Sequence, residues 1–287
     1  MSKLERKIDF AALITVDMAN CNGDPLNGNR PRVDFNGRGE ISDVCIKRKI
    51  RNRMQDLGYP IFVQSEDRCD DGMDSLSKRA NAALKGIKNK QEYAEAACRK
   101  WLDVRAFGQV FAFKGDKKDN EKGGDGVSVG VRGPVSIHQA VSISPVDVLT
   151  RQITKSVNGE SGDKRSKDTM GFKHMIRFGL YLLKGSINVQ LAEKTGFSEE
   201  DAEVLKQCLL TLFRNDVSSA RPDGSMSVHR LYWWEHNCKD GQYSSKTVHQ
   251  SLQVTLKDSV ELPSSVDDYQ IERLPLEGLS CEELAGE

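Results

Sequence analysis

The stretch that decides the fold is Ile8–Leu57, which reads IDFAALITVDMANCNGDPLNGNRPRVDFNGRGEISDVCIKRKIRNRMQDL. It opens with a largely apolar run, which is typical of a strand buried on both faces of a sheet. Residues 20–40 are rich in Asn, Gly and Pro and predict a long loop, a kind of segment that is often functional. Ser42 and Asp43 then supply N-cap chemistry for an amphipathic helix over 44–57.

Outward from this stretch, turn residues and hydrophobic spacing predict mixed helices and strands. Residues 59–63 look like a second strand, so the N-terminal part resembles the first half of a βαβ unit. Two basic loops, 20–40 and 150–171, separate the other elements. An α+β fold, with helices on one face of an antiparallel sheet, is therefore expected. The remaining expected elements are helices at 74–87, 90–104 and 198–214 and strands within 127–148, 174–189, 228–235 and 247–256.

Length and composition exclude several classes of protein. The 287 residues suffice for one large domain or two small ones. The seven cysteines form an odd set without a C-x-x-C pair, which argues against a disulfide framework and a zinc knuckle. The N-terminus lacks the apolar stretch of a signal peptide, and no segment is long and apolar enough to cross a bilayer. A cytoplasmic protein without membrane contact, metal or cofactor is expected.

The common catalytic signatures are missing from the sequence. It contains no Walker motif, no H-E-x-x-H and no G-x-S-x-G, so the usual hydrolase mechanisms lose support. The five histidines are scattered singly and fit ordinary hydrogen-bonded residues better than metal ligands.

Charge is balanced in total but segregated along the chain. Lys plus Arg and Asp plus Glu both number 42. Between Gly28 and Arg53, eight basic residues stand against three acidic ones, whereas from Asp258 onward nine acidic residues stand against one arginine. Binding to a polyanion must therefore be argued from local clusters.

The basic cluster combines a Gly/Asn-rich loop with the helix that follows it. Arginine guanidinium groups bind two phosphate oxygens at once. The N-terminus of a helix adds backbone N–H donors, and the loop glycines let a ligand approach the backbone closely. On the helix, Lys47 and Arg51 share one flank of the apolar face, and Lys49 and Arg53 share the other. A phosphate backbone fits this cluster better than a solvated basic face does.

The second basic excursion carries Lys164 and Arg165, followed by Met170 and Phe172. In a basic segment of this kind, the apolar side chains can insert between neighbouring bases of a single-stranded nucleic acid. The same composition also suits an unstructured loop, and the residues alone leave both alternatives open.

These segments resemble the backbone subunit of the type I-C CRISPR surveillance complex, Cascade, in the RAMP superfamily. The resemblance extends to about Lys257 and implies an RNA-recognition-like palm of βαββαβ topology over 1–257. It further implies a finger insertion at about 65–126, a thumb loop at about 150–173 and an acidic C-terminal tail over 258–287. The motifs that carry it are Asn27-Gly28-Asn29-Arg30-Pro31-Arg32, the helix segment Asp43–Asn52, Phe107-Gly108, Arg132-Gly133-Pro134-Val135 and Ser142-Ile143-Ser144-Pro145-Val146.

The function implied by this resemblance is that of a non-catalytic scaffold in antiviral defence. Several copies would form a filament along a CRISPR guide RNA and present it for pairing with target DNA. Other partners would be the large subunit, a RAMP subunit that caps the 5′ handle of the guide, and small subunits. The implied RNA-binding residues are Arg30, Arg32, Arg38, Lys47, Lys49, Arg51 and Arg132, with Lys164, Arg165, Met170 and Phe172 in the thumb.

Two other interpretations remain at this point. Related subunits of type III complexes cut RNA with a loop aspartate and a divalent metal, and Asp34 occupies a comparable loop, with Asp24 and Asp43 nearby. An ion pair between Asp34 and the surrounding arginines fits the sequence equally well. A small-molecule enzyme that uses the Arg132-Gly133 turn as an anion site is the third interpretation, and nothing positive in the sequence favours it.

Overall fold

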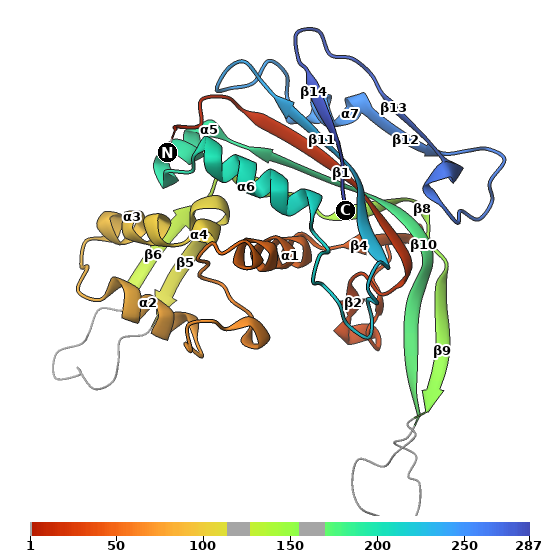
Figure 1. Cartoon of the computed structure of the whole chain (residues 1–287), viewed down its shortest axis with the longest axis horizontal. Coiled ribbons are helices and arrows are strands. Elements are labelled where there is room, and N and C mark those ends of the chain that lie inside the picture. The colour runs from red at the N-terminus through yellow and green to blue at the C-terminus, as the bar shows by residue number, and fades with distance from the viewer. Residues whose placement is uncertain (1, 114–126, 155–169) are drawn as a thin grey trace, which may run out of the picture.

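A computed structural model describes residues 2–113, 127–154 and 170–287 and centres on one eight-stranded sheet (Figure 1). Its strand order is β14-β11-β1-β10-β8-β4, and β7 and β9 also pair with β10. All of these pairings are antiparallel. The strands are β1 (Ile8–Ala19), β4 (Arg38–Ile41), β7 (Val135–Ile137), β8 (Ala140–Pro145), β9 (Val148–Thr154), β10 (Met170–Ile187), β11 (Met226–Glu235) and β14 (Cys281–Ala285).

The connectivity of the sheet confirms the expected α+β class. Strand β1, the helix Asp43–Asp56, strands β8 and β10, the helix Glu199–Leu210 and strand β11 follow one another in a βαββαβ order, with the other elements inserted between them. No helix within the described ranges is long and apolar enough to span a membrane. The helices are α1 (Asp43–Asp56), α2 (Leu76–Leu84), α3 (Lys90–Lys100), α4 (Leu102–Phe107), α5 (Val189–Thr195), α6 (Glu199–Leu210) and α7 (Ser245–Ser251). Three small hairpins pair β2 (Gly23–Asp24) with β3 (Arg30–Pro31), β5 (Gly108–Phe113) with β6 (Val127–Arg132), and β12 (Leu252–Leu256) with β13 (Tyr269–Arg273).

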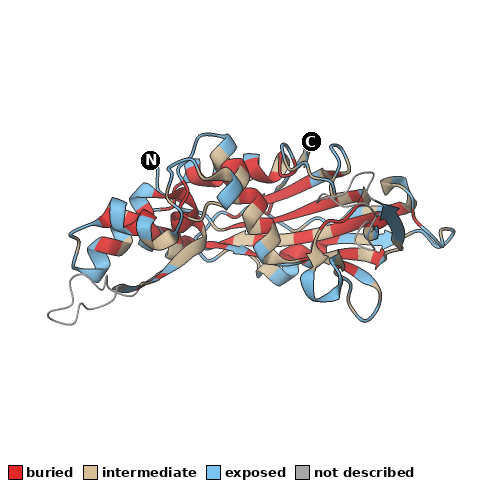
Figure 2. Cartoon of the chain, turned by 90° about the horizontal axis from the view of Figure 1, so that it is seen from below, coloured by how far each residue is buried: buried red, intermediate tan, exposed pale blue. Residues whose placement is uncertain are grey.

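Strand β1 lies in the middle of the sheet and is buried on both faces, as its apolar run predicts. Phe10 and Ile14 belong to the larger core, which they share with α1 and α6. Ala11 and Leu13 point to the opposite face and pack in a second cluster with residues of α7, β12 and β13. Figure 2 shows the buried strands running through the middle of the molecule. The sheet is therefore covered on two sides.

Helix α1 begins where the N-cap pattern predicts. The Ser42 side chain accepts a hydrogen bond from the Cys45 backbone N–H. Ile46, Ile50 and Met54 are fully buried against the sheet. Truncation of such a side chain to Ala costs about 2–5 kcal/mol in folding free energy, so this face holds the helix in place.

An insertion after α1 has a hydrophobic cluster of its own. Phe62, Trp101 and Phe111 form its aromatic centre, with Phe62 and Trp101 ring centroids 4.7 Å apart. Figure 1 shows α2, α3, α4, β5 and β6 together at one end of the molecule.

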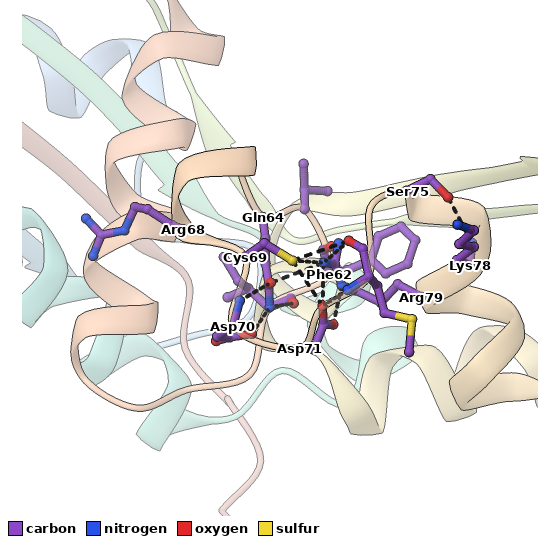
Figure 3. A network of polar contacts seen from close by, with 12 residues as sticks. Phe62, Gln64, Arg68, Cys69, Asp70, Asp71, Ser75, Lys78 and Arg79 are labelled. Atoms are coloured by element: carbon purple, nitrogen blue, oxygen red, sulfur yellow. Dashed lines mark hydrogen bonds and ion pairs between the residues drawn. The ribbon is translucent and has the colours of Figure 1, made fainter.

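One buried arginine organises the loop that leads into this insertion (Figure 3). The guanidinium of Arg79 on α2 donates to both carboxylate oxygens of Asp71 and to the carbonyl oxygens of Phe62 and Met73. It also reaches the side-chain oxygen of Gln64 at 3.1 Å. The hydrogen bond from Arg79 holds the pKa of Asp71 well below its usual range. This network ties residues 62–79 into one unit.

Three expectations need correction. Residues 59–63 form no strand, because the Asp103 carboxylate accepts the backbone N–H groups of Phe62 and Val63 at 2.6 and 3.1 Å. Residues 247–251, the first part of the strand expected at 247–256, belong to α7, since Ser244 caps a helix there. The acidic segment 258–287, expected as a C-terminal tail outside the palm, supplies β13 and β14, and β14 pairs with β11 in the main sheet.

Arg79→Met should destabilise the insertion. The change leaves buried acceptors without their donor, and because the Asp71 side chain is 33% exposed we expect a loss of about 2–3 kcal/mol in the free energy of unfolding. Chemical denaturation followed by circular dichroism measures this. The matched control is Lys78→Met on the same helix, whose partner Asp74 is exposed. Equal effects of the two substitutions would contradict the role assigned to Arg79.

Candidate nucleic-acid interface

The N-terminal loop is folded rather than open. Strands β2 and β3 pair within it, and Gly28, between them, has a φ of 57° that favours glycine. The Asp24 carboxylate accepts a hydrogen bond from the Leu26 backbone N–H at 3.2 Å and pairs with Arg32 at 3.4 Å. Arg32, predicted to bind phosphate, therefore has an acidic partner in the loop itself.

A tight turn follows at residues 34–38. Asp34 Oδ1 accepts the backbone N–H groups of Asn36 at 2.8 Å and of Arg38 at 2.9 Å. Gly37 has a φ of 74°, so glycine serves the turn geometry here. The turn presents a fully exposed Phe35 and the exposed side chain of Arg38. Asp34 thus acts as the cap of the turn.

Gly39 meets the core directly behind this turn. A Cβ at this position would lie 2.0 Å from the hydroxyl oxygen of Tyr181. Glycine is therefore required here because the Gly39 backbone lies against a side chain of the sheet. Burial raises the pKa of Tyr181 well above its usual value and that of Cys21 to about 11. Both groups stay neutral at physiological pH, which suits their position beneath the loop.

Two of the helix cations point inward. The Lys49 side chain is only 4% exposed, forms an ion pair with Asp216 and lies over the Phe213 ring. Arg53, on the same flank, donates to the Thr211 hydroxyl at 3.0 Å. This flank of α1 therefore packs against the segment after α6, and its two cations bind partners within the fold.

The other flank of α1 is also engaged. Arg51 donates to the Asp103 carboxylate at 2.9 Å and lies over the Phe107 ring. Lys47 pairs with Asp43 one turn earlier at 3.1 Å and stays partly exposed. Of the predicted helix cations, Lys47 keeps the most accessible charge.

The structure brings the loop arginine Arg30 next to the hairpin of β9 and β10. Arg30 Nη1 donates to the Thr150 hydroxyl at 3.1 Å, and that hydroxyl lies 3.0 Å from His174 Nδ1. The rings of His174 and Phe172 stack with centroids 6.4 Å apart. We call this surface the hairpin face, and it comprises Arg30, Thr150, Gln152, Met170, Phe172 and His174.

The hairpin face is open to solvent along its length. Met170 and Phe172 are 61% and 66% exposed, and the Gln152 amide lies 3.0 Å from the Met170 sulfur. Figure 1 shows the β9–β10 hairpin projecting from the body of the molecule. A flat, exposed aromatic pair on a strand is the kind of surface on which bases stack.

The opposite face of the hairpin carries two cations in register. Arg151 on β9 lies directly across from Lys173 on β10. Like charges at such positions repel, so the pair by itself destabilises the hairpin. An anion bound between the two side chains would relieve this repulsion, and a phosphate group has the required charge.

Three other predicted site residues lie elsewhere. Arg132 ends β6 in the insertion, across from Gly108, and is exposed. Lys164 and Arg165 lie outside the described residues. Thr150, Gln152 and His174 were missed in the sequence, although alternation along 148–154 and 170–176 would have placed them on one strand face with Phe172.

Comparison with known proteins then identifies the family. Residues 6–273 match the model of the family described as CRISPR-associated protein Cas7. This chain belongs to that family. A Cas7 protein of Haloferax volcanii is 26% identical over 220 residues, which cover 72% of this chain and 64% of the relative. The match thus spans less than two thirds of the length of this relative.

The fold of this Cas7 family member also recurs in a solved structure. A chain of a structure titled "CRISPR RNA-guided surveillance complex, pre-nicking" aligns with a TM-score of 0.54 at 15% identity, covering 88% of this chain and 83% of that one. The resemblance to the backbone-subunit family is confirmed by these findings, whereas the type I-C assignment stays a prediction.

The loop carboxylates are each held in a local interaction. Asp34 caps its turn, Asp24 caps a short helical turn and pairs with Arg32, and Asp43 pairs with Lys47. Within residues 2–113, 127–154 and 170–287, no group of three acidic, histidine or cysteine side chains is placed to hold a metal ion. The geometry of the loop therefore gives the metal-dependent alternative no support.

Substitutions of Asp34 distinguish a role as the cap of the turn from a role as a catalytic carboxylate. Asp34→Asn retains an oxygen that can accept the two N–H groups, so folding and RNA binding should stay as in the unsubstituted chain. Asp34→Ala removes the acceptor and should cost about 1 kcal/mol in stability. Thermal unfolding and RNA binding measure both variants. A Mg²⁺-dependent RNA cleavage that Asp34→Asn abolishes would instead make Asp34 a catalytic residue.

Proposed function

We propose that this chain is a non-catalytic scaffold that binds the guide RNA of a CRISPR assembly along the hairpin face and the adjoining loop. The observation that carries the proposal is the contact chain from Arg30 through Thr150 and His174 to Phe172. It joins a phosphate-binding side chain to a stacking surface on one continuous side of the molecule.

The proposed binding mode needs no base-specific contact. Arg30 binds phosphates from the N-terminal loop and Lys47 binds them from α1. The Arg151–Lys173 pair offers a further phosphate site on the opposite face of the hairpin. The rings of Phe172 and His174 accept any base, since every base has a π-face. Sequence specificity then comes from pairing between the guide and its target DNA.

Finer features of the proposal rest on family resemblance. Several copies would line the guide as a type I-C backbone, together with a large subunit, a 5′-handle-binding subunit and small subunits. In this assignment the main sheet is the palm, the insertion with its own aromatic cluster is the finger, and the β9–β10 hairpin is the thumb. The exposed thumb residues Met170 and Phe172 would displace bases at intervals along the guide.

Phe172→Ala and Arg30→Ala should weaken RNA binding in different ways. Loss of the stacking ring should lower the affinity for a fluorescein-labelled oligouridylate about tenfold at constant salt. Loss of Arg30 should lower the slope of log affinity against log salt by about one, because one phosphate contact disappears. Fluorescence anisotropy over a salt series measures both effects, for several RNA sequences.

The matched control for Arg30→Ala is Arg99→Ala on α3, since the Arg99 side chain is 71% exposed and lies in the insertion. Arg51→Ala serves as a stability control, because its loss of affinity should follow from the broken pair with Asp103 and should accompany a lower thermal midpoint. An affinity that is unchanged in Phe172→Ala, or lost for one RNA sequence alone, would refute the proposed binding mode.

A further inference from the structure

The elements that cover the face of the sheet opposite α1 leave one end of that face exposed. The hairpin β12–β13 and α7 pack over β1, β10 and β11, and the hairpin also reaches β8, where the Ser144 and Tyr269 hydroxyl oxygens lie 2.8 Å apart. The edge strand β4 and the adjoining part of β8 lie beside this cover. A groove of about 690 Å³ occupies this end, between β4, β7, β8 and β10 and the side chain of Val254 on β12. We call it the sheet-face groove, and the side chains that matter in it are Arg38, His138, Val141, Leu182, Lys184 and Val254.

The strand register explains how these side chains come together. Val141 on β8 lies directly across from Leu182 on β10, so both point to the same face. Lys184 follows two residues along β10 and shares that face. Glu40 on β4 is paired with Val141 from the other side, and its carboxylate accepts a hydrogen bond from the Gln139 amide at 3.3 Å. The groove therefore holds an aliphatic strip of Val141, Leu182 and Val254 within a lining that is mostly polar.

The cationic groups of the groove have no partner in the described part of the chain. Arg38 and Lys184 make no side-chain hydrogen bond or ion pair there, in contrast to the paired cations of α1. Glu40, held by Gln139, is the acidic residue beside them. Arg38 and Lys184 beside this aliphatic strip are complementary to a ligand that combines negative charge with a flat apolar surface.

We propose that the sheet-face groove binds a segment of single-stranded nucleic acid, with a base against Val141, Leu182 and Val254 and its flanking phosphates at Arg38 and Lys184. A nucleotide strand has this alternation of charge and apolar surface. A peptide strand suits the groove less well, because the exposed edge strand β4 has four residues and an irregular register and is a poor template for strand addition.

The groove lies on the opposite face of the sheet from α1 and shares no residue with the hairpin face. It therefore adds a second nucleic-acid contact to the one proposed above and does not depend on the hairpin face being correct. A strand that contacted both regions would pass over the β4–β8 end of the sheet.

The test compares two charge reversals in the full chain. Lys184→Glu should lower the affinity for the labelled oligouridylate about tenfold and reduce its salt dependence. Lys194→Glu on α5 makes the same charge change at an exposed site outside the groove and should have little effect. Should Lys184→Glu fold poorly by circular dichroism, Lys184→Gln, which removes the charge at the same position, serves as the test variant.

Photocrosslinking supplies an independent readout. RNA that contains 4-thiouridine should crosslink to peptides that include Val141 or Leu182, and mass spectrometry identifies them. Equal affinities of Lys184→Glu and Lys194→Glu would overturn the groove while leaving the hairpin face intact. Loss of binding in Lys184→Glu, with none in Phe172→Ala or Arg30→Ala, would support the groove and overturn the hairpin face. Loss of self-association alone in Lys184→Glu would assign the groove to a protein partner and overturn the proposal.

Discussion

The rest of the structure depends on one constraint, the burial of β1 on both of its faces. A central strand with apolar residues at successive positions needs a cover on each side of the sheet. Phe10 and Ile14 require the helix layer of α1 and α6, and Ala11 and Leu13 require α7 with the β12–β13 hairpin. The layer of α7 and the β12–β13 hairpin does not extend over the whole face of the sheet, and the sheet-face groove remains open at the β4–β8 end. The position of that groove thus follows from how β1 is buried.

Ion pairs decide which cations remain for a ligand. The chain has equal numbers of basic and acidic residues, and the structure shows how several of them neutralise each other inside. Lys49 and Arg51 of α1 are paired with Asp216 and Asp103, where an unpaired buried charge would be costly. At the proposed contacts, positive charge stays accessible on the exposed Arg38, on the partly exposed Lys184 and on the hairpin. The proposed nucleic-acid contacts therefore flank the helix and do not run along it.

Local signals predicted some elements well and failed where a distant side chain intervened. The N-cap at Ser42 and the apolar spacing of α1 were sufficient, because both act within one helix. The expected strand at 59–63 was wrong, because its backbone N–H groups bind a carboxylate about forty residues away, at Asp103. The acidic C-terminal segment shows no marked alternation, so its pairing with β11 could not be anticipated from composition.

For the candidate site, the sequence by itself determined the kinds of side chain: arginines in a glycine-rich loop, and Met170 and Phe172 beside a basic segment. Only the tertiary structure decided which of them share a surface. Arg30 bonds to Thr150, 120 residues further along the chain, and Thr150 in turn bonds to His174. Residue type follows from the sequence, whereas proximity and ion-pair partners depend on strand register and packing between distant segments, which no local pattern encodes.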